Sequence, residues 1–166
     1  MQIDRELIRL VPMTDERYRQ FFQGFKNDPD ICRPGQAYVR HDYSDEEVAR
    51  YIKRQRDFKR IPLAIMHGGE VVGEILIKDI EPHRCATLSV TLKSARYKDH
   101  GIGTRAEELA IRYVFDELDI PTLYADTFIS NGRSRHVLEK AGFKLIQDDG
   151  VRLYYRIDRE QNTASL

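Results

Sequence analysis

Residues 97–115 read YKDHGIGTRAEELAIRYVF, and two glycines in this stretch, Gly101 and Gly103, come directly before an apolar repeat. From Gly103 to Leu118, apolar residues recur at intervals of three and four, which predicts an amphipathic helix that Pro121 ends. The first turn of a helix leaves its N–H groups unpaired, and glycine lets a phosphate approach that backbone without a Cβ in the way. The stretch therefore predicts an anion site or, alternatively, a tight strand-to-helix turn.

The same glycines suggest a second alternative. Gly101, Gly103 and Ala106 fit the dinucleotide fingerprint G-x-G-x-x-A, with Asp126 as a ribose ligand at the end of the next strand. That fingerprint follows the first strand of a parallel unit directly. Here several predicted strands come earlier, the charged connector KSARYKDH intervenes, and little chain remains for a second βαβ half. A dinucleotide-binding protein is therefore the lesser alternative.

Composition restricts the class of protein. The chain has 166 residues, of which 41% are hydrophobic, enough for one ordinary core and too few for two domains. Because 27 basic residues balance 27 acidic ones, no net field attracts nucleic acid or a membrane surface, and neither partner is expected. No segment resembles a signal peptide or a membrane span, which predicts a soluble, cytoplasmic protein. Cys32 and Cys85 lack metal-ligand and redox spacing, so we expect reduced cysteines and no metal site.

The first part of the chain contains two predicted helices with recognisable caps. Thr14 and the acidic residues after it begin the first helix. Ser44 and Glu47 form a capping box for the second, which reaches about Phe58. Residues 27–43 lie between them, contain prolines and a glycine, and lack periodicity, which predicts a loop.

Alternating apolar runs predict the strands of one sheet. An edge strand, a hairpin around residues 67–69 and a third antiparallel strand precede the glycine-rich helix. A strand, a short helix over residues 134–141 and a hairpin turning at Asp149-Gly150 follow it. This order predicts an α/β (α+β) fold with helices on both faces of one sheet, in a single domain over residues 1–160 with a polar tail over residues 161–166.

Two motifs resemble one protein family. Residues 98–103, KDHGIG, resemble the acyl-CoA pyrophosphate loop of the GNAT N-acetyltransferases, usually written Q/R-x-x-G-x-G/A, with lysine here in the first position. Residues 131–134, NGRS, followed by VLEKAGF, are similar to the family's N-x-x-S/A and E-K-x-G-F segments. The resemblance covers residues 71–157 well and the two N-terminal helices more loosely. Two motifs in the expected order are much more specific than either one alone.

The resemblance implies a mixed sheet splayed at its middle, where the strand near residues 89–92 parts from the strand over residues 123–127. Acetyl-CoA, the acetyl donor, would lie in that gap. Backbone N–H groups of the loop would hold the pyrophosphate, while the strand before it would pair with pantetheine. Asn131 would bind the pantetheine arm or order its turn, and Lys98 and His100 would assist the phosphates or remain solvated. The implied donor-site residues are Thr91, Leu92, Lys98, Asp99, His100, Gly101, Ile102, Gly103, Thr104, Asn131 and Ser134.

The implied reaction is direct acetyl transfer from the thioester to an amine. A primary alkylamine has a pKa of about 10, so at neutral pH it is mostly ammonium and must lose a proton before it attacks. Many family members place a glutamate on the central strand, whereas this chain has Thr87 there. The remaining base candidates are Glu74, Asp126 and a chain of waters.

The acid that assists the leaving sulfur also departs from the family pattern. The position of the usual tyrosine is occupied by Leu138. Ser134 is the first candidate, because serine at this position is common in the branch that resembles ribosomal-protein and other protein N-terminal acetyltransferases. The alternative for Ser134 is a helix N-cap, and the two roles can coexist.

The acceptor is the least determined part. In this family the two N-terminal helices form one wall of the acceptor groove, and here their acidic and basic residues cancel. A protein N-terminus, a polyamine, an aminoglycoside or an amino-acid-like metabolite stays open, with peptide or protein N-terminal amines ahead on the branch resemblance. A protein that binds acyl-CoA as a sensor or structural partner, with little turnover, is the alternative from another class. An unpaired late strand would suit a homodimer.

Overall fold

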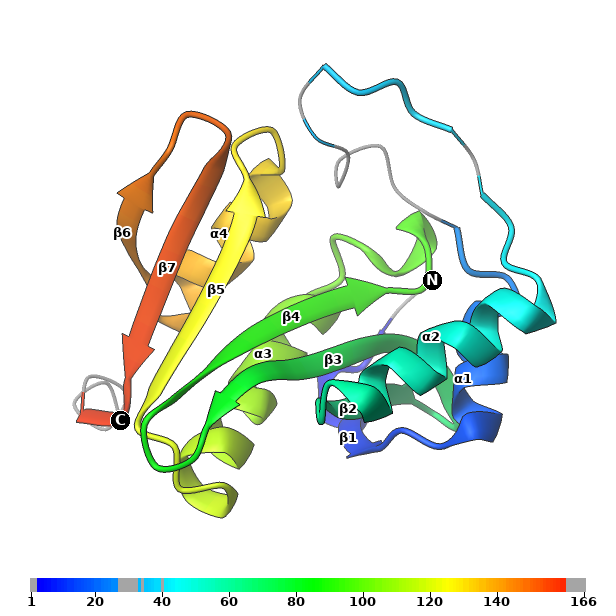
Figure 1. Cartoon of the computed structure of the whole chain (residues 1–166), viewed down its shortest axis with the longest axis horizontal. Helices are drawn as coiled ribbons and strands as arrows, with labels where there is room; N and C mark the ends of the chain where they lie inside the picture. Colours follow the sequence, from blue (N-terminus) through cyan, green and yellow to red (C-terminus); the bar gives the residue numbers. More distant parts are fainter. Residues whose placement is uncertain (1–2, 27–32, 34, 40, 161–166) are drawn as a thin grey trace.

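The structure is a computed structural model that describes residues 3–26, 33, 35–39 and 41–160. Within these residues, seven strands form one mixed sheet in the order β1-β2-β3-β4-β5-β7-β6 (Figure 1). The predicted tail over residues 161–166 and Cys32 lie outside the described residues. The strands are β1 (Ile8–Pro12), β2 (Ile61–His67), β3 (Glu70–Glu81), β4 (Cys85–Leu92), β5 (Thr122–Phe128), β6 (Lys144–Asp148) and β7 (Arg152–Asp158).

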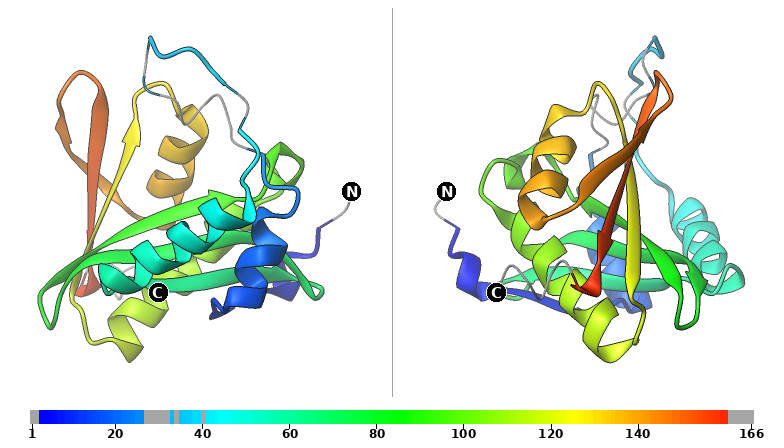
Figure 2. Two further views of the ribbon diagram at one scale, coloured as in Figure 1. Left: turned by 45° about the vertical axis from the view of Figure 1, so that its right-hand side comes forward. Right: turned by 90° about the vertical axis from the view of Figure 1, so that its left-hand side faces the viewer.

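Helices cover both faces of this sheet, as the sequence predicts. In the right-hand view of Figure 2, α2 and α4 lie on opposite sides of the strands. Tyr18 and Phe21 of α1 and Val48 and Ile52 of α2 pack in one cluster over β2 and β3, while α3 and α4 contribute to the larger core on the other face. The helices are α1 (Asp15–Phe22), α2 (Asp45–Asp57), α3 (Ile102–Arg112), continued by a π-helical turn (Tyr113–Glu117), and α4 (Gly132–Ala141).

The predicted splay at the middle of the sheet is confirmed. Strands β4 and β5 are parallel neighbours, but they pair only between Cys85–Thr87 and Thr122–Tyr124. Beyond these residues the two strands diverge, and they open into a V in Figure 1. The remaining neighbours, from β1 to β4 and from β5 to β6, pair antiparallel. The sheet is therefore two antiparallel halves joined by a short parallel contact.

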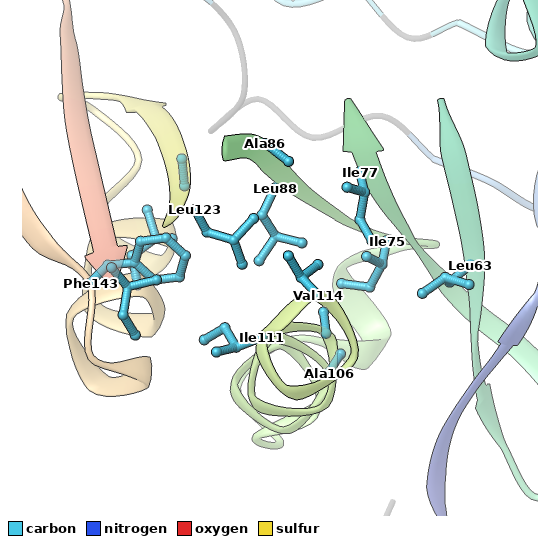
Figure 3. Packing of buried hydrophobic residues seen from close by; sticks show 14 of the residues in the cluster. Leu63, Ile75, Ile77, Ala86, Leu88, Ala106, Ile111, Val114, Leu123 and Phe143 are labelled. Carbon is cyan, nitrogen blue, oxygen red and sulfur yellow. The ribbon is translucent and has the colours of Figure 1, made fainter. Parts of the chain in front are cut away.

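Apolar side chains of α3 and of the π-helical turn that continues it hold the two halves together. In Figure 3, Ile111 and Val114 point toward Leu88 of β4 and Leu123 of β5. Val114 and Leu123 have no exposed surface, and all four belong to one buried cluster. Ala106 and Ala110 repeat on the same side of α3, so the period of three and four found in the sequence is the packing period of the core.

The predicted helix starts agree with the structure, with one exception. Thr14 Oγ1 accepts the N–H of Arg17 at 3.2 Å, and Ser44 and Glu47 form the capping box that begins α2. By contrast, α4 begins at Gly132, two residues before the predicted start, and Asn131 is its N-cap. The alternative in which Ser134 is an N-cap is therefore wrong.

No helix in the described part of the chain is both long enough and apolar enough to cross a lipid bilayer.

Candidate active site

The first turn of α3 presents backbone N–H groups that no side chain caps. Its N-cap, Gly101, is in the left-handed region with φ +76°, and among the described residues no side chain accepts a hydrogen bond from this turn. A Cβ at Gly101 would approach Arg5 Nε to 3.0 Å. In α1, α2 and α4, by contrast, a side-chain oxygen accepts an N–H of the first turn. The glycine-rich loop thus leaves α3 with open donors, as a phosphate site requires.

A cavity of about 570 Å³ opens at this helix end. It is lined by the glycine-rich loop, the end of β4 and the first turns of α3 and α4. His100 is the one predicted donor-site residue that is not among its described lining residues. The structure brings the other ten together around this cavity: Thr91, Leu92, Lys98, Asp99, Gly101, Ile102, Gly103, Thr104, Asn131 and Ser134.

Positive charge gathers at the loop side of this first cavity. Partial burial lowers the pKa of Lys98, and the nearby guanidinium of Arg133 lowers it further. Arg133 Nε lies 3.3 Å from Asp99 Oδ1, so one carboxylate offsets part of the charge. A phosphate bound here would meet two cations and an uncapped helix N-terminus. The residues present therefore fit the pyrophosphate of acetyl-CoA.

A second cavity, of about 230 Å³, lies at the open part of the V between β4 and β5. Residues of β3, β4, β5 and β7 line it, together with side chains from α3 and α4. Since both cavities have residues in common, they adjoin at the splay. The shared residues are Val90, Thr91, Glu107, Asn131 and Ser134.

Asp126, a predicted base, lines the second cavity only. Its carboxylate forms an ion pair with Arg152 Nη1, and the same guanidinium lies 4.2 Å from the centre of the Phe128 ring. Lys78 of β3 also lines this cavity. The charge of Asp126 is therefore already compensated in the protein itself.

Glu74, the other predicted base, does not line either cavity. It is 3% exposed, on the face of β3 covered by α1 and α2. The hydroxyl of Tyr51 donates to Glu74 Oε1 at 2.5 Å, while Glu74 Oε2 has no hydrogen-bond partner among the described residues. Burial raises the pKa of Glu74, and the hydrogen bond from Tyr51 opposes this rise. The structure thus separates Glu74 from the cavities that hold the donor-site residues.

Ser134 lies where the two cavities adjoin. It is the third residue of α4, and its backbone N–H donates to Asn131 Oδ1 at 3.1 Å. Because Asn131 supplies the cap, the hydroxyl of Ser134 is not needed to begin the helix. Leu138, where the family usually has its tyrosine, is buried and lines the second cavity.

One ionisable residue at the junction is absent from the sequence-based candidates. Glu107 of α3 is 4% exposed and lines both cavities. Its Oε2 atom has no hydrogen-bond partner among the described residues. A signal was available, because residue 107 falls beside Ala106 and Ala110 on the buried side of the predicted helix, where a charged residue is unusual.

Comparison with known proteins identifies the family. A family model described as "Acetyltransferase (GNAT) domain" matches residues 8–144. The chain therefore belongs to the GNAT acetyltransferase family, and it is an N-acetyltransferase that uses acetyl-CoA as its donor. Family membership also removes the ground for the dinucleotide alternative.

Among curated proteins, the chain is similar to the spermidine N(1)-acetyltransferase of Escherichia coli strain K12, with 28% identity over 144 residues, 83% of this chain and 73% of that protein. Among solved structures, an aminoglycoside acetyltransferase in complex with coenzyme A has a TM-score of 0.78 at 16% identity, covering 95% of this chain and 98% of that chain. The spermidine N-acetyltransferase of Vibrio cholerae, with CoA and spermine, has a TM-score of 0.77 at 14% identity, covering 95% and 99%. These structural similarities confirm the expected fold.

Proposed function

We propose that this protein transfers the acetyl group of acetyl-CoA directly to a primary amine that enters through the second cavity. The observation that carries this proposal is the junction of the two cavities at the splay, with Ser134 lining both. Direct transfer requires the thioester carbon and the amine nitrogen to be held within attack distance. Two adjoining cavities on either side of one gap provide such an arrangement.

The first cavity would hold the donor. N–H groups at Ile102, Gly103 and Thr104 would bind the pyrophosphate, with charge from Lys98 and Arg133. The free edge of β4 near Thr91 and Leu92 would pair with the pantetheine arm, since β5 has diverged from β4 at this level. The assistance expected from His100 and the donor-site role of Asp99 remain predictions.

Ser134 would act at the leaving group. As the C–S bond breaks, negative charge forms on sulfur, and a hydroxyl at the junction can donate a hydrogen bond to it. Backbone N–H groups at the splay would stabilise the charge that forms on the carbonyl oxygen during attack. Glu74 and Asp126 stay predictions for the role of base.

For the acceptor, we propose a small cationic amine or an exposed peptide N-terminus. The similar proteins named above act on spermidine or aminoglycosides, which favours polyamine and aminosugar amines. The N-x-x-S pattern at residues 131–134 favours the branch of ribosomal-protein and other protein N-terminal acetyltransferases. The lining of the second cavity combines Asp126 and Glu107 with Lys78 and Arg152, so acidic and basic side chains balance and the charge does not select strongly for a polycation.

Free thiol release from acetyl-CoA, measured over a panel of amines, tests this proposal. The panel contains spermidine, kanamycin, an amino acid amide and a peptide with a free N-terminus. We expect amine-dependent thiol release, with the acetylated product identified by mass spectrometry. Calorimetry with CoA runs in parallel. Tight CoA binding with no thiol release for any amine would contradict the proposal and favour the acyl-CoA-binding sensor.

A further inference from the structure

A buried carboxyl group occupies the meeting point of the two cavities. Of the five residues that line both, Glu107 is the one with an ionisable side chain. It is 4% exposed, and Oε2 has no hydrogen-bond partner in the part of the chain that the structure describes. A buried polar atom without a partner costs folding free energy, so its retention needs a reason. A bound substrate would supply the missing partner.

We propose that Glu107 is the general base of this enzyme and accepts the proton of the acceptor ammonium group at the junction of the two cavities. This inference rests on the proposed function. In its ionised form Glu107 takes one proton from R–NH3⁺, and the free lone pair of the amine forms the N–C bond with the thioester carbon. The C–S bond breaks with its electron pair going to sulfur. The nitrogen loses a second proton, the thiolate gains one, and one proton in total leaves to solvent.

Position separates Glu107 from the other two carboxylates. Asp126 lines only the second cavity, and Arg152 already neutralises it. Glu74 does not line either cavity and accepts a hydrogen bond from Tyr51. A general base must be within hydrogen-bond reach of its proton, directly or through one water. Among the described residues, Glu107 is the carboxylate that lines both the donor cavity and the acceptor cavity, so a substrate on either side can approach it.

The surroundings of Glu107 suit a base that works near neutral pH. Burial raises the pKa of Glu107 to about 8, and a base is most effective when its pKa lies close to the operating pH. An ammonium group entering the second cavity would lower this pKa and favour the ionised form. The charged groups that line the second cavity with it are Lys78, Asp126 and Arg152. Those that line the first are Lys26, Lys98, Asp99, Arg133, His136 and Lys140.

The test uses Glu107→Gln in the full chain, with two acceptors that differ in basicity. The first is the best alkylamine of the panel, which is protonated at neutral pH. The second is hydroxylamine, which is mostly unprotonated at neutral pH and needs no base to expose its lone pair. Glu108→Gln, on the same helix, is the matched control, since Glu108 pairs with Arg105 and lines neither cavity. CoA affinity and thermal midpoint are measured for each variant.

We expect Glu107→Gln to lower kcat/KM for the alkylamine by about 100-fold or more at pH 7. The rate should recover as the pH approaches the pKa of the amine, because the unprotonated amine then forms without a base. With hydroxylamine the loss should be under about fivefold, and CoA affinity should be unchanged. Equal rates for Glu107→Gln and the unmodified protein with the alkylamine would overturn the inference. The inference would also be overturned if Glu74→Gln or Asp126→Asn, and not Glu107→Gln, showed this pH-dependent loss of kcat/KM. Absence of turnover by the unmodified protein with every amine would overturn the proposed function as well. This outcome differs from a failure of the Glu107 inference alone, in which the unmodified protein is active and Glu107→Gln is equally active.

Discussion

Burial of Glu107 makes the stability of the protein depend on pH. Its pKa in the folded state is about 8, above the ordinary value of 4.5, so folding favours the protonated form. The contribution of the protonated Glu107 carboxyl to the free energy of unfolding is therefore complete below about pH 4.5, and it is lost as the pH rises to about 8. We expect Glu107→Gln to remove this dependence. Between pH 5 and pH 9, the free energy of unfolding of the variant should therefore fall by roughly 2 to 5 kcal/mol less than that of the unmodified protein.

Urea unfolding at the two pH values measures this difference. Glu108→Gln serves as the control, because Glu108 is partly exposed and pairs with Arg105. A variant that lost as much stability as the unmodified protein between pH 5 and pH 9 would show that Glu107 does not hold a raised pKa.

Glu74 has a structural environment that can be tested separately from catalysis. Tyr51→Phe removes the hydroxyl that donates to Glu74 Oε1 and leaves a buried carboxyl with one partner fewer. We expect a loss of about 1 to 3 kcal/mol in the free energy of unfolding. Tyr154→Phe is the matched control, because it removes an exposed hydrogen bond to Asp149 and should cost under about 1 kcal/mol. Equal losses in the two variants would mean that the buried hydrogen bond to Glu74 contributes no more to the free energy of unfolding than the exposed one to Asp149.

At the start of α4, capping and chemistry belong to different residues. Asn131→Ala removes the oxygen that accepts the N–H of Ser134, and should cost about 0.5 to 2 kcal/mol of stability. Ser134→Ala keeps that cap, so we expect a smaller loss of stability together with a slower acetyl-transfer step. Thermal midpoints and single-turnover rates separate the two effects. A Ser134→Ala protein with an unchanged rate would remove Ser134 from the role of acid.

At the start of α3, Gly103 serves the ligand more than the fold. A Cβ at Gly103 would lie 3.7 Å from Val137 Cγ1, an ordinary contact, so the helix has room for a side chain there. We expect Gly103→Val to fold with a thermal midpoint close to that of the unmodified protein, since replacing a helical glycine relieves chain entropy. Its affinity for CoA should fall at least tenfold, because the branched side chain covers the N–H groups that would hold the pyrophosphate. Calorimetry decides this, and unchanged affinity in the folded variant would contradict the donor site.

At the scale of the whole molecule, the exposed edge of the sheet at β6 bears on whether two copies of the chain associate. Within the described residues, β6 is an edge strand whose one paired neighbour is β7, and it exposes Leu145 and Ile146 at 51% and 54%. Exposed edges of this kind pair with another chain unless charge or proline blocks them. The expected homodimer remains a prediction, as does the cytoplasmic location. Sedimentation equilibrium should show a dimer that Ile146→Lys converts to a monomer, and a monomer before any substitution would contradict this.

Much of the fold follows from local patterns in the chain. The capping box at Ser44 and Glu47, the turn at residues 67–69 and the repeat of apolar residues along α3 each depend on neighbours within a few positions. Such interactions are encoded by residues close in sequence, so the helices, hairpins and donor-site loop could be predicted. The sequence does not determine the start of α4, because Asn131 and Ser134 are both good cap residues and their spacing alone does not choose between them.

The site at the splay depends on contacts between residues far apart in the chain. Glu74 and Asp126 are both acidic residues on strands, yet the fold buries one against Tyr51 and pairs the other with Arg152. The sequence does not single out Glu107, because Arg105 and Glu108 beside it make it look like one charge among several on an amphipathic helix. Its place at the junction depends on two long-range features, the divergence of β4 from β5 and the packing of α3 across both halves of the sheet. Local sequence determines which backbone groups can bind the donor, whereas long-range packing determines which carboxyl group meets the acceptor, because burial and pairing are properties of the assembled sheet.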